Sequence, residues 1–189
     1  MPSRDIVSGP STPLGLLIAQ TVGITSSLYL LGSNAALSLI AVPAVLQAPA
    51  PLAAKQWYTV LTRGGTLARP LAMLSALATA YAAYTQPRDS IPFKLHVAAT
   101  ILIPSIVPFT FAFIVPTNNK LIAKKDEFAS LSQKSARTKA GMPGGWDDVE
   151  ADRSETVHAL IDRWAVLNLL RVGLVAGGSL CAVLAALHP

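Results

Sequence analysis

Four long apolar stretches constrain this chain more than any other feature of its sequence. They cover residues 14–45, 67–84, 96–115 and 165–187. A helix needs about 20 apolar residues to cross the hydrocarbon core of a bilayer. In lipid, every backbone N–H and C=O must find a partner within the protein, which favours helices. The sequence therefore predicts an all-α fold, an integral membrane four-helix bundle, in which the first helix is long enough to tilt or kink.

The overall composition agrees with this class of protein. Of the 189 residues, 52% are hydrophobic and only 13% are charged, against about 25% charged residues in soluble domains. The formal charge of +5 is modest. Because the basic residues lie in loops beside apolar stretches and not on one continuous surface, we expect no nucleic-acid binding. Cys181 is the single cysteine, so one chain can form neither an internal disulfide nor a cysteine-based metal site.

The hydrophilic segments set the expected domain organisation. Residues 1–13 are rich in proline and serine and are predicted to form a flexible N-terminal tail. Residues 14–189 are predicted to form a single four-helix transmembrane domain, with a long hydrophilic loop at 116–163 between the third and fourth helices. Residues 49–65 mix apolar and basic side chains, which predicts an interfacial amphipathic helix with Trp57 at headgroup level.

The distribution of Lys and Arg predicts the orientation of the helices. The first and third loops lie on the same side of the predicted bundle and carry most of the basic residues, whereas the N-terminal tail and the second loop carry only Arg4, Arg88 and Lys94. The positive-inside rule then places the 116–163 loop in the cytosol and both termini on the lumenal or outer side. We expect a multi-pass protein of the endoplasmic reticulum or another endomembrane, in contact with membrane lipid.

Two polar residues in the fourth apolar stretch point to a functional site. Asn168 and Arg171 interrupt an otherwise apolar helix. A guanidinium stays charged there and is costly at hydrocarbon depth unless it faces a polar cavity or a partner. Trp164, Asn168 and Arg171 are spaced i, i+4 and i+7, so all three project from one helix face. We expect this face to point at something polar inside the bundle.

Polar residues and prolines in two other stretches fit the same interpretation. The first stretch carries a stripe of small and polar residues at helical spacing: Gln20, Gly23, Ser27, Asn34 and Ser38. Asn34 either pairs with a neighbouring helix or lines a polar cavity. In the third stretch, Pro104 and Pro108 each remove a backbone donor, so this helix must bend. The carbonyls freed by the bend must face protein, water or a ligand.

The histidines supply candidates for acid–base chemistry. His158 and Asp162 are spaced i, i+4, so a His–carboxylate pair is available, although a solvated surface pair would have the same spacing. His96 begins the third apolar stretch. The sequence has no cluster of metal-ligand residues at a suitable spacing and no Gly-rich nucleotide fingerprint. If the protein is an enzyme, we therefore expect no metal site and no cofactor.

Two local motifs occur together at defined places in this layout. Pro116-Thr117-Asn118 with Leu121 follows the third apolar stretch, and Trp164-x-x-x-Asn168-x-x-Arg171 enters the fourth. With the four-helix pattern and the long third loop, the chain resembles the anthrone oxygenase family over about residues 15–186. This resemblance implies oxidation of an anthrone to an anthraquinone by O₂ in aromatic polyketide biosynthesis, without metal or flavin.

The resemblance also implies roles for the polar residues. Arg171 suits stabilisation of the substrate enolate, Asn168 and Asn118 suit orientation of its phenols, and Trp164 suits stacking on its rings. Asn34 is expected to contribute to the same substrate site. The general base stays open between His158, His96 and Asp162.

A non-enzymatic membrane protein is the competing hypothesis. A small transporter, a scaffold or a subunit of a larger complex would also have four apolar helices. In such a protein, the buried Asn and Arg side chains would serve only helix assembly.

Overall fold

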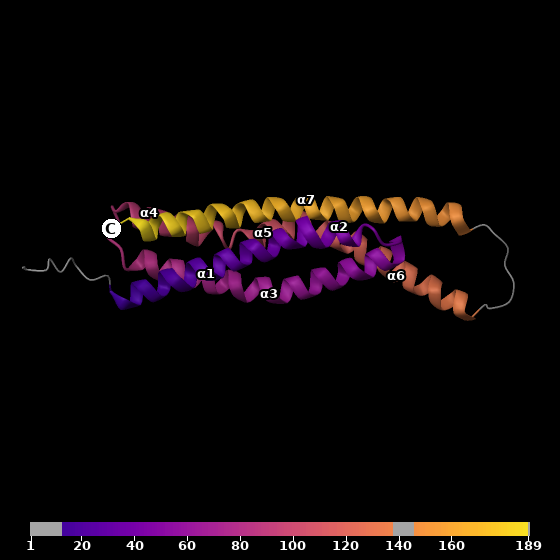
Figure 1. Cartoon of the computed structure of the whole chain (residues 1–189), viewed down its shortest axis with the longest axis horizontal. Coiled ribbons are helices and arrows are strands. Elements are labelled where there is room, and N and C mark those ends of the chain that lie inside the picture. Colours follow the sequence, from indigo (N-terminus) through magenta and orange to yellow (C-terminus); the bar gives the residue numbers. More distant parts are fainter. Residues whose placement is uncertain (1–12, 138–145, 189) are drawn as a thin grey trace, which may run out of the picture.

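The computed structural model describes the backbone of residues 13–137 and 146–188, and the side chains of residues 13–132 and 156–188. Within these ranges the protein is all-helical, and four helical segments run side by side along the long axis (Figure 1). The all-α bundle expected from the sequence is confirmed. The expected N-terminal tail lies almost wholly outside the described residues.

The first and third segments are each divided into several elements. The first consists of α1 (Leu14–Ala36), a π-helical turn η1 (Leu37–Ala41) and α2 (Val42–Val45). The third consists of α4 (Ile91–Leu102), α5 (Ile106–Phe109), a second π-helical turn η2 (Thr110–Ile114) and α6 (Val115–Arg137). The break between α4 and α5 coincides with Pro104, where a backbone donor is missing, whereas α5 continues through Pro108; a bend at either proline stays a prediction.

The second and fourth segments are continuous helices, α3 (Ala50–Tyr84) and α7 (Trp146–Leu187). The expected interfacial helix at 49–65 is therefore not a separate element, because it continues directly into the following apolar stretch. The predicted position of Trp57 at headgroup level is also wrong. Its side chain is only 1% exposed and packs inside the protein.

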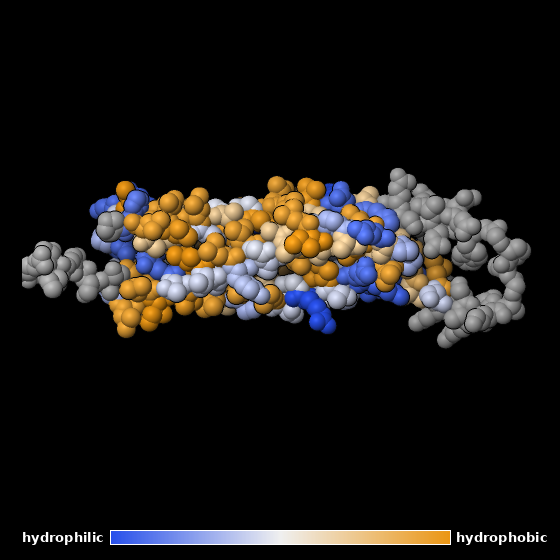
Figure 2. Space-filling model, viewed as in Figure 1, coloured by the Kyte–Doolittle hydropathy of each residue, from blue (hydrophilic) through white to orange (hydrophobic). Residues whose placement is uncertain are grey.

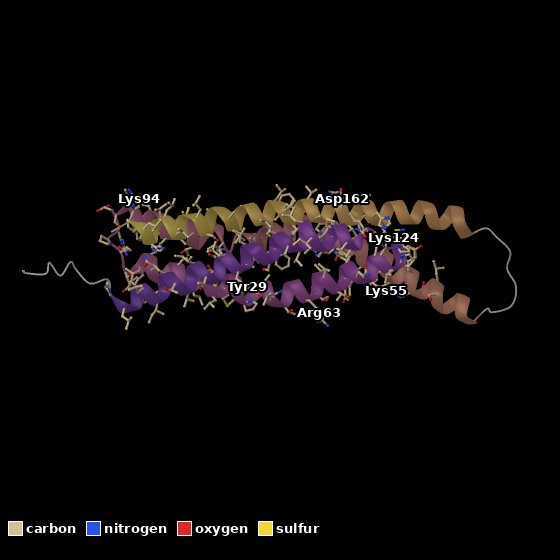
Figure 3. The ribbon with its side chains drawn as sticks, in the orientation of Figure 1. Tyr29, Lys55, Arg63, Lys94, Lys124 and Asp162 are labelled. Carbon is tan, nitrogen blue, oxygen red and sulfur yellow. The ribbon has the colours of Figure 1, made fainter. Side chains whose placement is uncertain are left out.

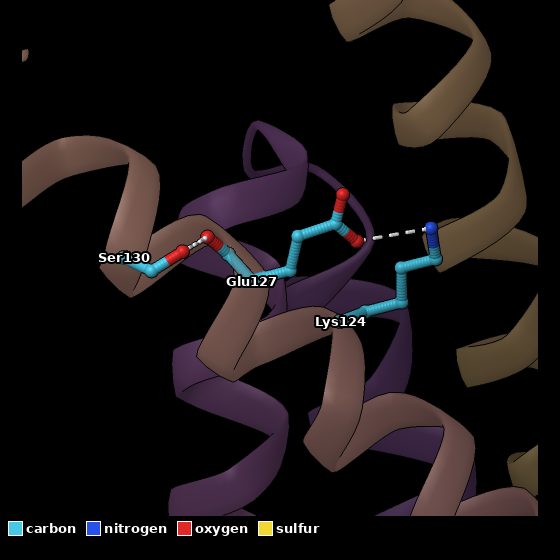
Figure 4. A network of polar contacts seen from close by, with 3 residues as sticks. All are labelled: Lys124, Glu127 and Ser130. Atoms are coloured by element: carbon cyan, nitrogen blue, oxygen red, sulfur yellow. Dashed lines mark hydrogen bonds and ion pairs between the residues drawn. The ribbon is translucent and has the colours of Figure 1, made fainter. Parts of the chain in front are cut away.

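The hydrophilic segment at 116–163 is mostly helical. α6 extends through its first part, and α7 begins well before the apolar stretch (Figure 1). On the polar end of α6, Lys124 and Glu127 form an ion pair at 3.2 Å, and Ser130 donates to the Glu127 carbonyl at 2.8 Å (Figure 4). Partly exposed pairs of this kind add little to stability.

Within the part of the chain that the structure describes, three segments are long and apolar enough to cross a membrane: Leu14–Val45, Ile91–Ser132 and Thr156–Leu187. These match a multi-pass membrane protein. α3 does not reach this apolar content, because residues 67–84 include Arg69, Ser75 and Thr79, so its membrane crossing stays a prediction. Apolar side chains cover much of the visible face of the bundle, and hydrophilic ones gather toward its ends (Figure 2).

The charged side chains fit this arrangement. Lys94 lies at one end of the bundle, whereas Lys55 and Lys124 lie toward the other (Figure 3).

A stripe of small residues lets α1 approach α3 closely, since Ser75 donates to the Gly23 carbonyl at 2.9 Å. α1 and α3 run antiparallel, because Gly23 lies against Thr79 while Leu37 lies against Gly64. The helices therefore bring residues far apart in the sequence to the same level.

Candidate active site

Arg171 meets two other segments inside the bundle. Its Nη2 donates to Asn34 Oδ1 of α1 at 2.7 Å, and its Nη1 donates to Thr110 Oγ1 of η2 at 3.3 Å. Among the residues that the structure describes, no Asp or Glu forms an ion pair with Arg171. The guanidinium is thus held by neutral oxygens, and no acidic side chain among the described residues neutralises its charge.

Asn168 lies one turn before Arg171 and joins the same network. Its Nδ2 donates to the Asn34 carbonyl at 2.9 Å and to Ser38 Oγ at 2.7 Å. Ser38 in turn donates to the Ala165 carbonyl at 3.1 Å. These bonds fix the orientation of the Asn168 amide, because only its nitrogen can donate. Asn34, Asn168 and Arg171 therefore lie together in the structure; their role in a substrate site stays a prediction.

Both π-helical turns lie at this network. Ser38 belongs to η1 and Thr110 to η2, and each turn is followed directly by a Val-Pro pair, at 42–43 and at 115–116. Proline lacks an N–H, and its ring clashes with the carbonyl four residues earlier in a regular helix. A wider π turn relieves this conflict, and such turns are frequent at functional sites.

Several buried polar atoms at the network have no hydrogen-bond partner within the described residues. They are Arg171 Nε, Asn34 Nδ2 and Asn168 Oδ1. Each buried polar group without a partner costs about 1–3 kcal/mol. The network therefore offers two donors and one acceptor that the protein itself leaves unused. Because the donors include a cation, the favoured complement is an anionic or carbonyl oxygen.

A second group of unpartnered atoms lies nearer the polar end of α6. Trp57 and Trp164 pack edge to face, with ring centroids 6.1 Å apart, and both indole N–H groups are buried without a partner. Asn118 Oδ1 is in the same condition. Asn118 follows Ile114 by four residues and precedes Leu121 by three, and both of these pack in the core that contains the two tryptophans.

Residues 57–181 match the family model of anthrone oxygenase, a range that includes Trp57, Asn118, Trp164, Asn168 and Arg171. This protein belongs to the anthrone oxygenase family. The resemblance drawn from the two short motifs is confirmed. No solved structure matches the chain.

Three fungal relatives illustrate this membership. An anthrone oxygenase, encC, of Aspergillus fumigatus is 28% identical, and the match covers 90% of this chain and 93% of the relative. Anthrone oxygenase AgnL2 of Paecilomyces divaricatus is 29% identical over 81% of this chain and 85% of its own. A noranthrone monooxygenase of Aspergillus flavus is 25% identical over 87% of this chain and 71% of its own.

In the structure, His96 lies far from the network around Arg171. His96 is fully buried in α4, and its Nε2 lies 3.4 Å from Gln20 Nε2. Gln20 and Asn34 are fourteen residues apart on α1, which is about 20 Å along a helix. His96 therefore lies near the opposite end of the bundle from Trp57 and Trp164.

His158 and Asp162 also lie away from Arg171. His158 Nε2 lies 3.0 Å from the Ala48 carbonyl, and His158 is thirteen residues before Arg171 on α7, about 20 Å along the helix. Asp162 is exposed and lies on the outer side of α7 (Figure 3). Both side chains are described, and no hydrogen bond or ion pair joins them. The available spacing is thus not used for a His–carboxylate pair.

The sequence interpretation missed three residues of the site. The sequence places Trp57 at the membrane surface, gives no role to Thr110, and indicates Ser38 only as one member of a stripe of small and polar residues. A signal for the last two was present in the Val-Pro pairs that follow each π turn.

Among the described residues, no three His, Cys, Asp or Glu side chains converge into a metal-binding group; the expectation of a metal-free reaction stays a prediction.

Proposed function

We propose that this protein is an oxygenase that converts an anthrone to the corresponding anthraquinone with O₂. Membership of the anthrone oxygenase family and the names of the relatives support this activity. The observation that carries the proposal is the partly buried Arg171 guanidinium, which has no acidic partner among the described residues and one buried, unpartnered N–H. A cation so placed suits an oxygen that becomes negative during the reaction.

The chemistry needs little from the protein beyond this cation. An anthrone has an acidic CH₂ between two aromatic rings, conjugated with a carbonyl. Loss of one proton gives an anthranolate, which transfers an electron to O₂; the two radicals combine to a hydroperoxide, and loss of water gives the quinone. One anthrone and one O₂ thus yield one anthraquinone and one water. Stabilising the anthranolate oxygen favours the proton loss that starts this sequence.

Each residue of the network has a proposed role. Arg171 Nε donates to the anthranolate oxygen, and Asn34 Nδ2 supplies a second donor. Asn168 Oδ1 accepts a hydrogen bond from a phenol beside that oxygen. Asn34, Thr110 and Ser38 keep Arg171 and Asn168 in their orientations through the hydrogen bonds described above. Positioning of this kind is a large part of enzymatic rate enhancement.

The general base is not assigned to one of the three candidates. His96 and His158 are each about 20 Å from the network along the helices, and Asp162 is exposed. We propose that the cation makes the substrate acidic enough for water to accept the proton. This role for Arg171 does not need a side-chain base in contact with the substrate.

A membrane location suits both reactants. Anthrones and O₂ are apolar and partition into lipid, and the site lies within segments that are apolar enough to cross a membrane. We propose the endoplasmic reticulum or another endomembrane as the location. A transporter, scaffold or subunit role is less favoured, because the family and the named relatives are anthrone oxygenases.

The test uses the purified full-length protein in detergent with emodin anthrone in air-saturated buffer. Formation of the anthraquinone is followed by absorbance and compared with the spontaneous rate in detergent alone and with heat-denatured protein. We expect a rate well above both controls that disappears under anaerobic conditions and survives chelators without added flavin. A rate equal to the spontaneous one for folded protein would reject the proposed function.

A further inference from the structure

Trp57 and Trp164 contact each other, and Asn118 lies between Ile114 and Leu121, which pack in the same core. All three carry a buried polar atom without a partner among the described residues, and the reaction itself needs none of these atoms. We propose that Trp57, Trp164 and Asn118 bind a phenolic hydroxyl on the ring edge of the substrate that is remote from Arg171. This subsite makes the protein prefer substrates that carry a hydroxyl on that edge. The proposal rests on the proposed function for the class of ligand.

The chemistry of the three groups selects a hydroxyl. Trp57 Nε1 and Trp164 Nε1 are donors only, and Asn118 Oδ1 is an acceptor only; all three atoms are buried and have no partner within the described residues. A carbonyl oxygen would satisfy the donors and leave Asn118 Oδ1 unpaired. A methyl group or a ring C–H would satisfy none of them. Of these substituents, only a hydroxyl both accepts from an indole N–H and donates to Asn118.

Burial makes these atoms significant. Trp57 is 1% exposed and Trp164 is 2% exposed. Indole N–H groups usually find a hydrogen-bond partner when they are buried. A pair of tryptophans that served only packing would gain nothing from two unpaired N–H groups, since phenylalanine rings would fill the core without that desolvation. The unpartnered N–H groups therefore point to a ligand.

The spacing from the cation agrees with a flat tricyclic ligand. Trp164 and Arg171 are seven residues apart on α7, which is about 10 Å along a helix. α6 runs antiparallel to α7, so that Asn118, eight residues after Thr110, lies at the level of Trp164 when Thr110 lies at the level of Arg171. Three fused rings with oxygen substituents on opposite edges can bridge these two groups.

The test measures equilibrium binding of two anthraquinones that differ by one hydroxyl. Emodin and chrysophanol share the carbonyl flanked by two hydroxyls, and only emodin carries a further hydroxyl on the opposite edge. Calorimetry with the detergent-solubilised full-length protein should show emodin binding about tenfold or more tightly, as expected for hydrogen bonds to buried groups. Equal affinities, or no binding of either compound, would overturn the proposal.

Single substitutions then assign the preference to the tryptophans. Trp57→Phe and Trp164→Phe each keep an aromatic ring and remove one N–H, and each should reduce the emodin preference to about threefold or less. Arg171→Gln should lower the affinity for both compounds by the same factor and leave the preference for emodin intact. Tyr58→Phe is the matched control, because Tyr58 is exposed beside Trp57 and its change should leave both affinities unaltered.

The outcomes separate this proposal from the proposed function. Binding is measured with products and requires no turnover. If the protein prefers emodin but does not oxidise anthrones, the subsite proposal stands and the proposed oxygenase function fails. If the protein oxidises anthrones but binds both quinones equally, the proposed function stands and the subsite proposal fails. If both tryptophan variants keep the full preference, the subsite lies elsewhere and the proposal fails.

Discussion

Replacing Arg171 by glutamine separates a catalytic role from a structural one. Arg171 holds Asn34 Oδ1 at 2.7 Å and Thr110 Oγ1 at 3.3 Å, and it keeps Nε–H unpaired. Glutamine can still donate to Asn34 but has neither the charge nor the Nε donor. If the guanidinium stabilises the anthranolate, the turnover number should fall about 10²- to 10³-fold, as on removal of one oxyanion donor in other enzymes.

The same substitution should change stability much less. Loss of a charge-assisted hydrogen bond destabilises a protein by about 1.5–3 kcal/mol. Removal of a charge from the apolar centre of a membrane helix stabilises it by about 2.5–3.5 kcal/mol on insertion scales. The two effects largely cancel, so the free energy of unfolding should change by less than about 2 kcal/mol. For a chain of this size, that corresponds to a shift in Tm of less than about 8 °C.

The assay compares three variants in detergent. Oxidation of emodin anthrone is followed by absorbance after subtraction of the spontaneous rate, and Tm is measured by circular dichroism. Arg171→Lys keeps the charge and loses the planar fork, so it should also lose about 10²-fold or more in rate. Arg163→Gln removes a charge from an exposed position on the same helix and should leave both quantities near wild type. A stable Arg171→Gln protein with wild-type turnover would refute the catalytic role.

Three further predictions concern packing, acid–base chemistry and topology. Gly178→Ala should destabilise the protein by about 1–3 kcal/mol, because an added Cβ would lie 2.6 Å from Ile103 Cγ1. An added Cβ at Gly173 on the same helix would meet nothing within 4 Å, so Gly173→Ala should stabilise the protein by about 0.5–1 kcal/mol. Equal shifts in Tm for the two variants would contradict this packing. His96→Gln should change turnover by less than about threefold, since a general base would lose more on replacement; a 10²-fold loss in a folded variant would return His96 to the site. An epitope tag in the 116–163 segment should be cytosolic in sealed microsomes, and protection of the tag from added protease would reverse the orientation.

The helical class and the central polar network could be predicted from the sequence because each depends on local rules. Apolar length predicts helices in a membrane protein, and the i, i+4, i+7 spacing places Trp164, Asn168 and Arg171 on one face. A buried cation must find polar partners wherever they lie. Asn34 was identified by the same reasoning, since an amide in an apolar helix needs a partner.

What could not be predicted depends on the tertiary arrangement. The sequence around Trp57 has the composition of a membrane-surface helix. Only the contact of Trp57 with Trp164, which comes from a distant part of the chain, shows that Trp57 is buried. His158 and Asp162 have the spacing of a pair, but His158 lies against the Ala48 carbonyl of another segment instead. In both cases, a long-range contact decides between two arrangements that the local sequence allows equally.

The π turns were predictable in principle, from a periodicity that an α-helix cannot maintain. The inward-facing residues of the first segment include Leu30, Asn34, Ser38 and Val42, each four residues after the last. In an α-helix, each such step rotates the facing direction by about 40°, so three steps would turn Val42 well away from Leu30. A wider turn absorbs this drift, and the proline at 43 removes the N–H that a regular helix would use. The third segment repeats the pattern, with steps of four from 106 to 118 and a proline at 116. Steps of four followed by Val-Pro therefore mark the places where this bundle turns hydroxyl and amide groups toward Arg171.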